Sequence, residues 1–257
     1  MEVTPLSGGT PNQLEGSAPD RVYKTVQRAE LHSFTVAAPR ARVLLCAGGG
    51  YVSLAYEREG AEVATWLNAA GFDAHVLVHR LPGSAGHPPS VALTDGMAAL
   101  VHLQSLPVLP LFLMGLSSGG HLAGVLACQP EARHALGLLI AYAPLNANHR
   151  DHKAPVGKPD YPPPEKQAFY DAWPIGIASE RHGLPPQPIF LTYALHDKIV
   201  PIEHALNIIR SARDAGLDLD AHVFNDAPHG FALRDLEGAQ RHWPGLALDW
   251  MERRLGN

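Results

Sequence analysis

Short apolar runs alternate along the chain with longer segments of mixed polarity. The runs lie at residues 43–47, 74–79, 111–115, 137–142, 189–194 and 221–224, and the segments between them, long enough for helices, at 57–70, 91–106, 118–129, 202–215 and 240–255. In the first of these segments Val63, Trp66, Leu67 and Ala70 recur every three or four residues and would form one apolar face. Helices that separate short buried strands are typical of βαβ units, so the pattern predicts an α/β fold with a mostly parallel sheet and helices on both faces. Residues 30–37 could add antiparallel strands at its start.

Two stretches depart from this alternation. Residues 1–20 are rich in Gly, Pro and Ser, which predicts a loose N-terminal arm before a domain of residues 21–257. Residues 144–188 contain many prolines together with Tyr161, Phe169, Tyr170 and Trp173. Loops of this length are uncommon in compact domains unless they are functional, which favours a lid-like insert over a pocket. A surface excursion with a short helix near residues 165–171 is the alternative.

Composition excludes several classes of function. The chain has 257 residues, of which 46% are hydrophobic, and a net charge of −5, so it can bury a sizeable core and lacks a basic field for nucleic acid. With no signal-like start and no apolar run of membrane length, we expect a cytoplasmic protein with no membrane partner, although a chain whose leader had been removed would look the same. Whether it forms a homo-oligomer is left open. Cys46 and Cys128 lie in apolar runs and read as buried free thiols. No cofactor or metal is expected, because His149 and His152 in HRDH do not have the spacing of common zinc sites.

A candidate nucleophile lies in GLSSG, residues 115–119, which matches the pattern G-x-S-x-G. The pattern alone is weak, but here an apolar strand precedes it and an alanine-rich helix follows it. A serine at such a sharp turn exposes its hydroxyl, and the flanking glycines let strand and helix pack closely. Ser117 would also lie near a helix N-terminus, whose partial positive charge favours a developing anion. A glycine-rich helix entry without chemistry is the alternative.

A serine needs a base and an acid, which in this architecture follow it in the order Ser, acid, His. Among 15 histidines, His229 in FNDAPHGFAL follows the last predicted strand, at the sheet edge where α/β active sites lie. Asp197 in IFLTYALHDKIVP comes three residues after the preceding strand and could orient the imidazole. Asp226 is the rival acid, although it more naturally stabilises its own turn.

Three glycines directly after the first strong strand predict a site where the backbone must be bare. Acyl transfer places negative charge on a carbonyl oxygen, and preorganised N–H groups must meet that charge. We therefore assign the N–H groups of Gly49, Gly50 and Ser118 to an oxyanion hole, with Tyr51 as a neighbouring alternative. A nucleotide site is excluded, because neither G-x-G-x-x-G nor G-x-x-x-x-G-K-[ST] is present.

Five blocks of sequence together resemble a known family. They are GGGYVSLAYEREGAEVATWLNAAGFDAHVLVHRLP, GLSSGGHLAG, HDKIVPIEHALNIIRSARDAG, HVFNDAPHGFAL and WPGLALDWMERRL. In this order they resemble α/β-hydrolase-fold serine esterases with an HGGG-type oxyanion loop (hormone-sensitive-lipase-like), and more narrowly the bacterial acetyl-xylan-esterase-like branch. The resemblance implies a Ser117–Asp197–His229 triad and small acyl groups on sugars. Ala47 departs from it where relatives have Pro or His, His79 where they often have Tyr, and the 144–188 insert has no counterpart.

These features predict an enzyme that cleaves short-chain carboxylic esters through an acyl-enzyme, with a small-molecule ester as substrate. An amidase or formamidase acting on small acylated amines is the alternative, and a non-catalytic binding module is a third possibility that retention of all three triad residues disfavours. Tyr51 and Trp173 are the predicted pocket wall, because large rings beside the oxyanion hole would exclude long acyl chains and could stack on sugar faces.

Overall fold

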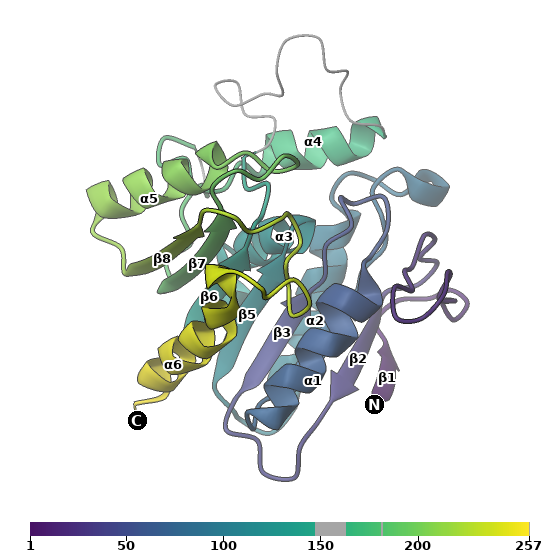
Figure 1. The fold of residues 1–257 in the computed structure, drawn as a ribbon. Coiled ribbons are helices and arrows are strands. Elements are labelled where there is room, and N and C mark those ends of the chain that lie inside the picture. The colour runs from purple at the N-terminus through teal and green to yellow at the C-terminus, as the bar shows by residue number, and fades with distance from the viewer. Residues whose placement is uncertain (147–162, 181, 257) are drawn as a thin grey trace.

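The fold is built on one eight-stranded sheet, seen in a computed structural model that describes residues 1–146, 163–180 and 182–256 (Figure 1). The strand order is β1-β2-β4-β3-β5-β6-β7-β8, with β1 and β2 antiparallel to their neighbours and every pairing from β4 to β8 parallel. The strands are β1 (Glu2–Pro5), β2 (Glu30–Phe34), β3 (Arg42–Cys46), β4 (Asp73–Val78), β5 (Leu111–Leu116), β6 (Gly137–Ala141), β7 (Ile189–Ala194) and β8 (Leu219–Phe224). The predicted α/β class and the mostly parallel sheet are confirmed.

Helices cover both faces of the sheet (Figure 1). The α-helices are α1 (Glu62–Ala69), α2 (Val91–Ser105), α3 (Ser118–Ala127), α4 (Pro164–Ala172), α5 (Glu203–Ala215) and α6 (Trp243–Leu255). Shorter helical turns are η1 (Tyr56–Ala61, a π-helical turn), η2 (Ser84–Gly86), η3 (Pro130–Ala132) and η4 (Ala239–His242). Apolar side chains of α1 and α6 pack on one face of the sheet, and those of α2, α3 and α5 pack on the other. Strands covered on both sides must be apolar throughout, which explains the continuous apolar runs in the sequence.

The N-terminal segment differs from the loose arm predicted for residues 1–20. Strand β1 (Glu2–Pro5) pairs along β2, with Val3 opposite His32, and Glu15 bridges Val22. The sequence did not indicate this strand because it has four residues, mostly exposed, with one apolar side chain among them apart from proline. Backbone pairing with β2, rather than side-chain burial, holds it in place, and such pairing leaves little trace in hydropathy.

The 144–188 region is described in part. Residues 147–162 and 181 lie outside the described residues, and with them Tyr161, His149 and His152. Helix α4 (Pro164–Ala172) matches the short helix considered for residues 165–171, and its Phe169 and Tyr170 are buried against the face that α2, α3 and α5 cover. The insert is thus anchored to the core through α4, and its role as a lid stays a proposal.

Parallel strand directions bring four loops to one edge of the sheet. The glycine run follows β3, Ser117 follows β5, Asp197 follows β7 and His229 follows β8. The carboxyl edge of an open α/β sheet is where ligands bind in proteins of this class. Among the helices of the described residues, none has both the length and the apolar character needed to cross a membrane.

Candidate active site

Ser117 occupies a strained turn between β5 and α3. Its φ of 49° and ψ of −129° are rare for a residue with a side chain, and such strain concentrates at functional sites. The flanking glycines are required sterically: a Cβ on Gly115 would lie 2.1 Å from the Gly119 carbonyl oxygen, and one on Gly119 would lie 2.0 Å from the Cys46 carbonyl oxygen. The spacing G-x-S-x-G therefore follows from close packing of α3 against β3 and β5.

The structure brings Ser117, His229 and Asp197 together. Ser117 Oγ lies 3.1 Å from His229 Nε2, and His229 Nδ1 lies 2.7 Å from Asp197 Oδ2. Because an ionised carboxylate only accepts hydrogen bonds, Nδ1 carries the proton and Nε2 is free to accept the serine proton. The three side chains thus form one directed chain of hydrogen bonds, in the geometry of a nucleophile, a base and an orienting acid.

Asp197 is held by its own loop as well as by the histidine. Its Oδ1 accepts the N–H groups of Ile199 at 2.8 Å and Val200 at 2.9 Å, and its side chain has no exposed surface. Burial raises the pKa of the Asp197 carboxyl, but the His229 hydrogen bond and the two N–H groups together bring that pKa below its ordinary value. The rival acid Asp226 is exposed and accepts a hydrogen bond from its neighbour Asn225. The geometry therefore favours Asp197.

The glycine run places its backbone next to Ser117. Gly49 and Gly50 have φ of 128° and 65°, and a Cβ on Gly49 would lie 2.2 Å from the Ser53 carbonyl oxygen. Gly50 N–H donates to Ser118 Oγ at 2.8 Å, so in this structure that donor is engaged by the protein itself. Within the described part of the chain, the N–H groups of Gly49 and Ser118 have no acceptor. Two of the three predicted donors are therefore not engaged by other groups within the described residues.

Tyr51, predicted as part of the pocket wall, is almost fully buried in the structure. Its side chain is 1% exposed, its hydroxyl lies 2.9 Å from His121 Nδ1, and its ring packs edge-on against Phe169 and Tyr170 of α4. The residue is buried because α4 covers it, a contact between distant segments that the sequence pattern does not reveal. Tyr51 therefore links the glycine loop to α4.

Trp173, the other residue predicted for the pocket wall, follows the end of α4. Its ring stacks on His182 at 5.2 Å, and the His182 carbonyl accepts a hydrogen bond from Cys128, at the end of α3 remote from Ser117. The Trp173 carbonyl accepts the Nε2–H of His121 at 2.7 Å. Residue 173 therefore contacts α3 through its backbone, and its indole is directed to the distal end of that helix.

Two charged residues near the loop were not predicted from the sequence. Lys166 on α4 brings its Nζ to 3.6 Å from the position that a Cβ on Gly50 would occupy, and burial lowers the pKa of its ammonium. Glu59 in η1 is 5% exposed and accepts the Gly48 N–H at 2.8 Å. A signal for Glu59 was present: it precedes Val63 by four residues and therefore falls on the apolar face that Val63, Trp66, Leu67 and Ala70 define.

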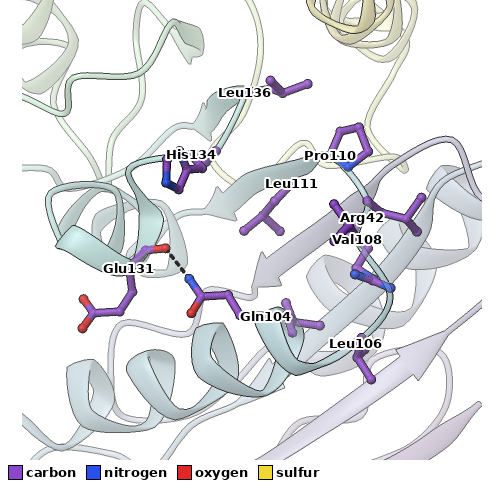
Figure 2. A pocket seen from close by; sticks show the side chains of 12 residues that line it. Arg42, Gln104, Leu106, Val108, Pro110, Leu111, Glu131, His134 and Leu136 are labelled. Carbon is purple, nitrogen blue, oxygen red and sulfur yellow. Dashed lines mark hydrogen bonds between the residues drawn. The ribbon is translucent and has the colours of Figure 1, made fainter.

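Surface hollows lie at both edges of the sheet. One of about 530 Å³ is bounded by His196–Ile199 and by Asn225–His229, so it adjoins the candidate acid and base. Another of about 450 Å³ lies at the opposite edge, around Arg42, Leu111 and Val108, where Gln104 donates to the Glu131 carbonyl (Figure 2). Arg42 and Leu111 begin β3 and β5, so this second hollow is separated from Ser117 by the length of the strands.

Across residues 1–146, 163–180 and 182–256, no three His, Cys, Asp or Glu side chains are arranged to hold a metal ion. Cys46 and Cys128 are free, and burial raises the pKa of each thiol to about 12, which leaves them protonated and unreactive.

Comparison with solved structures shows the α/β-hydrolase fold. An acetyl ester-xyloside bifunctional hydrolase from Caldicellulosiruptor lactoaceticus aligns with a TM-score of 0.67 at 20% identity, covering 88% of each chain. A sugar hydrolase from Lactococcus lactis gives 0.71 at 19% identity over 96% of this chain and 99% of that one, and a carboxylesterase from Lactobacillus plantarum gives 0.69 at 18% identity over 99% and 98%. The resemblance noted in the sequence is thereby confirmed at the level of fold.

Comparison by sequence identifies the family. No curated protein sequence gave a match. A family model described as the prolyl oligopeptidase family matches residues 90–257, which is more than half of the chain and includes Ser117, Asp197 and His229. The chain therefore belongs to the prolyl oligopeptidase family of serine hydrolases.

Proposed function

We propose that this protein cleaves short-chain carboxylic esters of small molecules through a covalent acyl-enzyme. The observation that carries the proposal is the directed chain of hydrogen bonds from Ser117 through His229 to Asp197. This arrangement can remove a proton from a serine hydroxyl as the oxygen attacks a carbonyl carbon.

The reaction follows from the positions of the three side chains. Ser117 Oγ attacks the acyl carbon while its proton moves to His229 Nε2, which gives a tetrahedral oxyanion. As the bond to the alcohol oxygen breaks, His229 returns the proton to that oxygen and the acyl group stays on Ser117. Water then attacks the acyl-serine with His229 as base, and the carboxylic acid leaves. Asp197 keeps the imidazole oriented and stabilises its cationic form in both halves.

The oxyanion is stabilised, in this proposal, by the N–H groups of Gly49 and Ser118. Both donors have no acceptor within the described residues, and Ser118 begins α3, whose N-terminal dipole adds to the effect. Gly50 N–H is engaged by the Ser118 hydroxyl and acts mainly to fix the loop, although rotation of that hydroxyl would release it as a third donor.

Substrate preference is proposed to be for acetyl-type groups on a polar alcohol, with sugars as the first class to test. The name of the Caldicellulosiruptor protein describes action on acetyl ester and xyloside, which supports sugar esters as candidates.

Cleavage of small acylated amines is a second candidate, and the family match favours it. The matched family takes its name from an oligopeptidase, and the same acyl-enzyme chemistry cleaves amides when the base can protonate a departing amine. The two candidates differ in the leaving group, since an amine must be protonated before it departs.

The experiment compares matched esters and amides. Rates with p-nitrophenyl acetate, butyrate and octanoate, p-nitroacetanilide and acetylated xylo-oligosaccharides are measured under one set of conditions. The proposal predicts acetate as the best aryl ester, a steep fall to octanoate, and slower cleavage of the anilide. Octanoate as the best substrate would point to an extended acyl tunnel, and an anilide rate equal to the acetate rate would favour the amidase. If the enzyme hydrolyses p-nitrophenyl acetate well but leaves the acetylated xylo-oligosaccharides intact, only the proposal of sugar esters as substrates is excluded.

A further inference from the structure

We propose that Glu59 is a positioning residue that holds the glycine loop and the loop carrying His229 in fixed relation to Ser117. The inference rests on the proposed function and assigns a role to a side chain that does not itself contact the serine hydroxyl or the imidazole through a hydrogen bond. The Glu59 carboxylate is buried and makes no hydrogen bond to Ser117, His229 or Asp197.

Glu59 is directed into the site by a π-helical turn. It lies in η1 (Tyr56–Ala61), where its N–H donates to the Ala55 carbonyl at 2.9 Å, and the chain then continues directly into α1. Wide turns of this kind occur inside helices mostly at functional sites, because they re-aim a side chain at the cost of regular hydrogen bonding. Its neighbours Glu57 and Arg58 remain partly exposed, whereas Glu59 is buried.

One carboxylate oxygen holds the glycine loop. Glu59 Oε2 accepts the N–H of Gly48 at 2.8 Å, and Gly49, the next residue, provides one of the two proposed oxyanion donors. A Cβ on Gly48 would lie 2.4 Å from that oxygen and 2.6 Å from Ser117 Cβ. The Glu59 carboxylate therefore lies on one side of Gly48 and Ser117 lies on the other. Displacing the carboxylate would remove the hydrogen bond that holds Gly48 in this position.

The other carboxylate oxygen is connected to the histidine loop. Tyr142 donates its hydroxyl to Glu59 Oε1 at 3.2 Å. The Tyr142 ring packs edge-on against the His229 imidazole, with ring centres 5.2 Å apart. A Cβ on Gly230 would lie 3.7 Å from Glu59 Oε1, so the carboxylate also lies against the residue that follows the base.

Two backbone features and a neighbouring side chain support the same conclusion. Tyr142 and Ala232 have φ of 38° and 35°, strained values for residues with side chains, which persist where surrounding contacts fix them. Arg58, adjacent in η1, donates to the Gly230 carbonyl through Nε at 3.0 Å and Nη2 at 2.8 Å. The η1 turn therefore contacts the His229 loop through two consecutive side chains and the glycine loop through one.

Stability alone does not account for a carboxylate at this position. Burial raises the pKa of Glu59, and the Gly48 N–H, His229 and Tyr142 offset only part of that effect. Burying an acid costs free energy that an apolar side chain of similar size would not cost. The carboxylate supplies two acceptor oxygens in fixed positions, one to the Gly48 N–H and one to the Tyr142 hydroxyl, whereas a leucine would supply neither.

The test separates position from charge with two variants of the same residue. Glu59→Gln keeps the length and an acceptor for the Gly48 N–H but removes the charge. Glu59→Asp keeps the charge but withdraws the carboxylate by about 1.5 Å. Glu57→Gln and Glu57→Asp, in the same turn but at a residue paired with Arg21 in the N-terminal segment, are the matched controls. Active sites are counted with a fluorophosphonate probe, and kcat and KM for p-nitrophenyl acetate are expressed per labelled site.

We expect Glu59→Gln to keep kcat within about threefold of the wild type, and Glu59→Asp to lose between about tenfold and a hundredfold in kcat with KM changed less than threefold. Both Glu57 variants should stay within twofold. A Gln variant that falls as far as the Asp variant would overturn the proposal, as would an Asp variant that lowers only the number of labelled sites. Should Glu59→Asp not fold, Tyr142→Phe serves in its place, with an expected three- to tenfold fall in kcat per site at unchanged KM. An unchanged kcat there also overturns the proposal. A wild type that neither labels nor hydrolyses any ester would overturn the proposed function and this inference together.

Discussion

Replacing Asp197 with Asn should reverse the proton arrangement of the histidine. Asp197 Oδ1 accepts two backbone N–H groups, so the amide oxygen of an asparagine must take that position. Its NH₂ group then faces His229 Nδ1, at the 2.7 Å contact that the carboxylate makes now. Two donors cannot share one hydrogen bond, so Nδ1 becomes the acceptor and the ring proton moves to Nε2. The imidazole then donates to Ser117 and can no longer accept its proton.

The expected loss follows from this change of tautomer. The same substitution in a serine protease triad lowers kcat by about 10⁴, which corresponds to about 5 kcal/mol in the activation barrier. Here the amide is fixed by the loop N–H groups of Ile199 and Val200, which prevents it from turning its oxygen to the histidine. We therefore expect a loss of the full order of 10⁴ in kcat, with KM for a small ester little changed.

The assay uses p-nitrophenyl acetate with Asp226→Asn as the matched control. Asp226 lies three residues before His229 and is exposed, so its variant should remain within about tenfold of the wild type. Circular dichroism establishes that both variants are folded. An Asp197→Asn enzyme that retains a tenth of the activity, or a large loss in Asp226→Asn instead, would refute the assignment of the acid.

Three further outcomes follow from the structure. A fluorophosphonate should label Ser117 in the wild type and not in Ser117→Ala, while Ser118→Ala, which keeps its backbone N–H, should still be labelled; full labelling of Ser117→Ala by intact-mass analysis would exclude it as nucleophile. Burial lowers the pKa of His121 to about 4 from an ordinary 6.5. The unfolded chain thus binds the extra proton first as pH falls, and unfolding free energy should drop by about 3 kcal/mol between pH 6.5 and 4, a slope that urea titrations should find reduced in His121→Gln. Gly119→Ala, whose Cβ would lie 2.0 Å from the Cys46 carbonyl oxygen, should lower unfolding free energy by about 1–3 kcal/mol or more and abolish activity, and a stable, active variant would contradict the packing described for α3.

Much of the fold was predictable because strands covered on both faces leave continuous apolar runs. The run at residues 111–115 is β5 and that at 189–194 is β7, and predicted helices such as 91–106 differ from the observed bounds by one residue. Strand β1 was missed because its stability comes from backbone pairing with β2. The helix predicted for residues 57–70 begins in the structure as the π-helical turn η1 and becomes α-helical only at Glu62. The π-helical turn was not predicted, because it has no hydropathic period of its own.

The candidate site divides along similar lines. Ser117, Asp197 and His229 each follow a strand within a few residues. Because a parallel sheet brings the carboxyl ends of its strands to one edge, their proximity could be predicted from the sequence. The burial of Tyr51 could not be predicted, because it depends on α4, more than a hundred residues away in sequence. Glu59 lies in EREG, between the charged Arg58 and the small Gly60. This local sequence is typical of a solvent-exposed helix face. Burial of Glu59 is predicted only if the apolar period of the following helix is continued toward the N-terminus as far as residue 59.

The position of β8 at the end of the sheet has a consequence for how activity is lost. This strand pairs with β7 alone, and its side chains are the least covered of the parallel strands, with Val223 41% exposed. Edge segments with few buried contacts open with less free energy than the centre of a fold. Since His229 follows β8, transient fraying at this edge would move the proposed general base away while Ser117, next to the central strands, stays in place. We therefore expect heat or denaturant to inactivate the protein through a local event at the sheet margin, before the cooperative unfolding of the core.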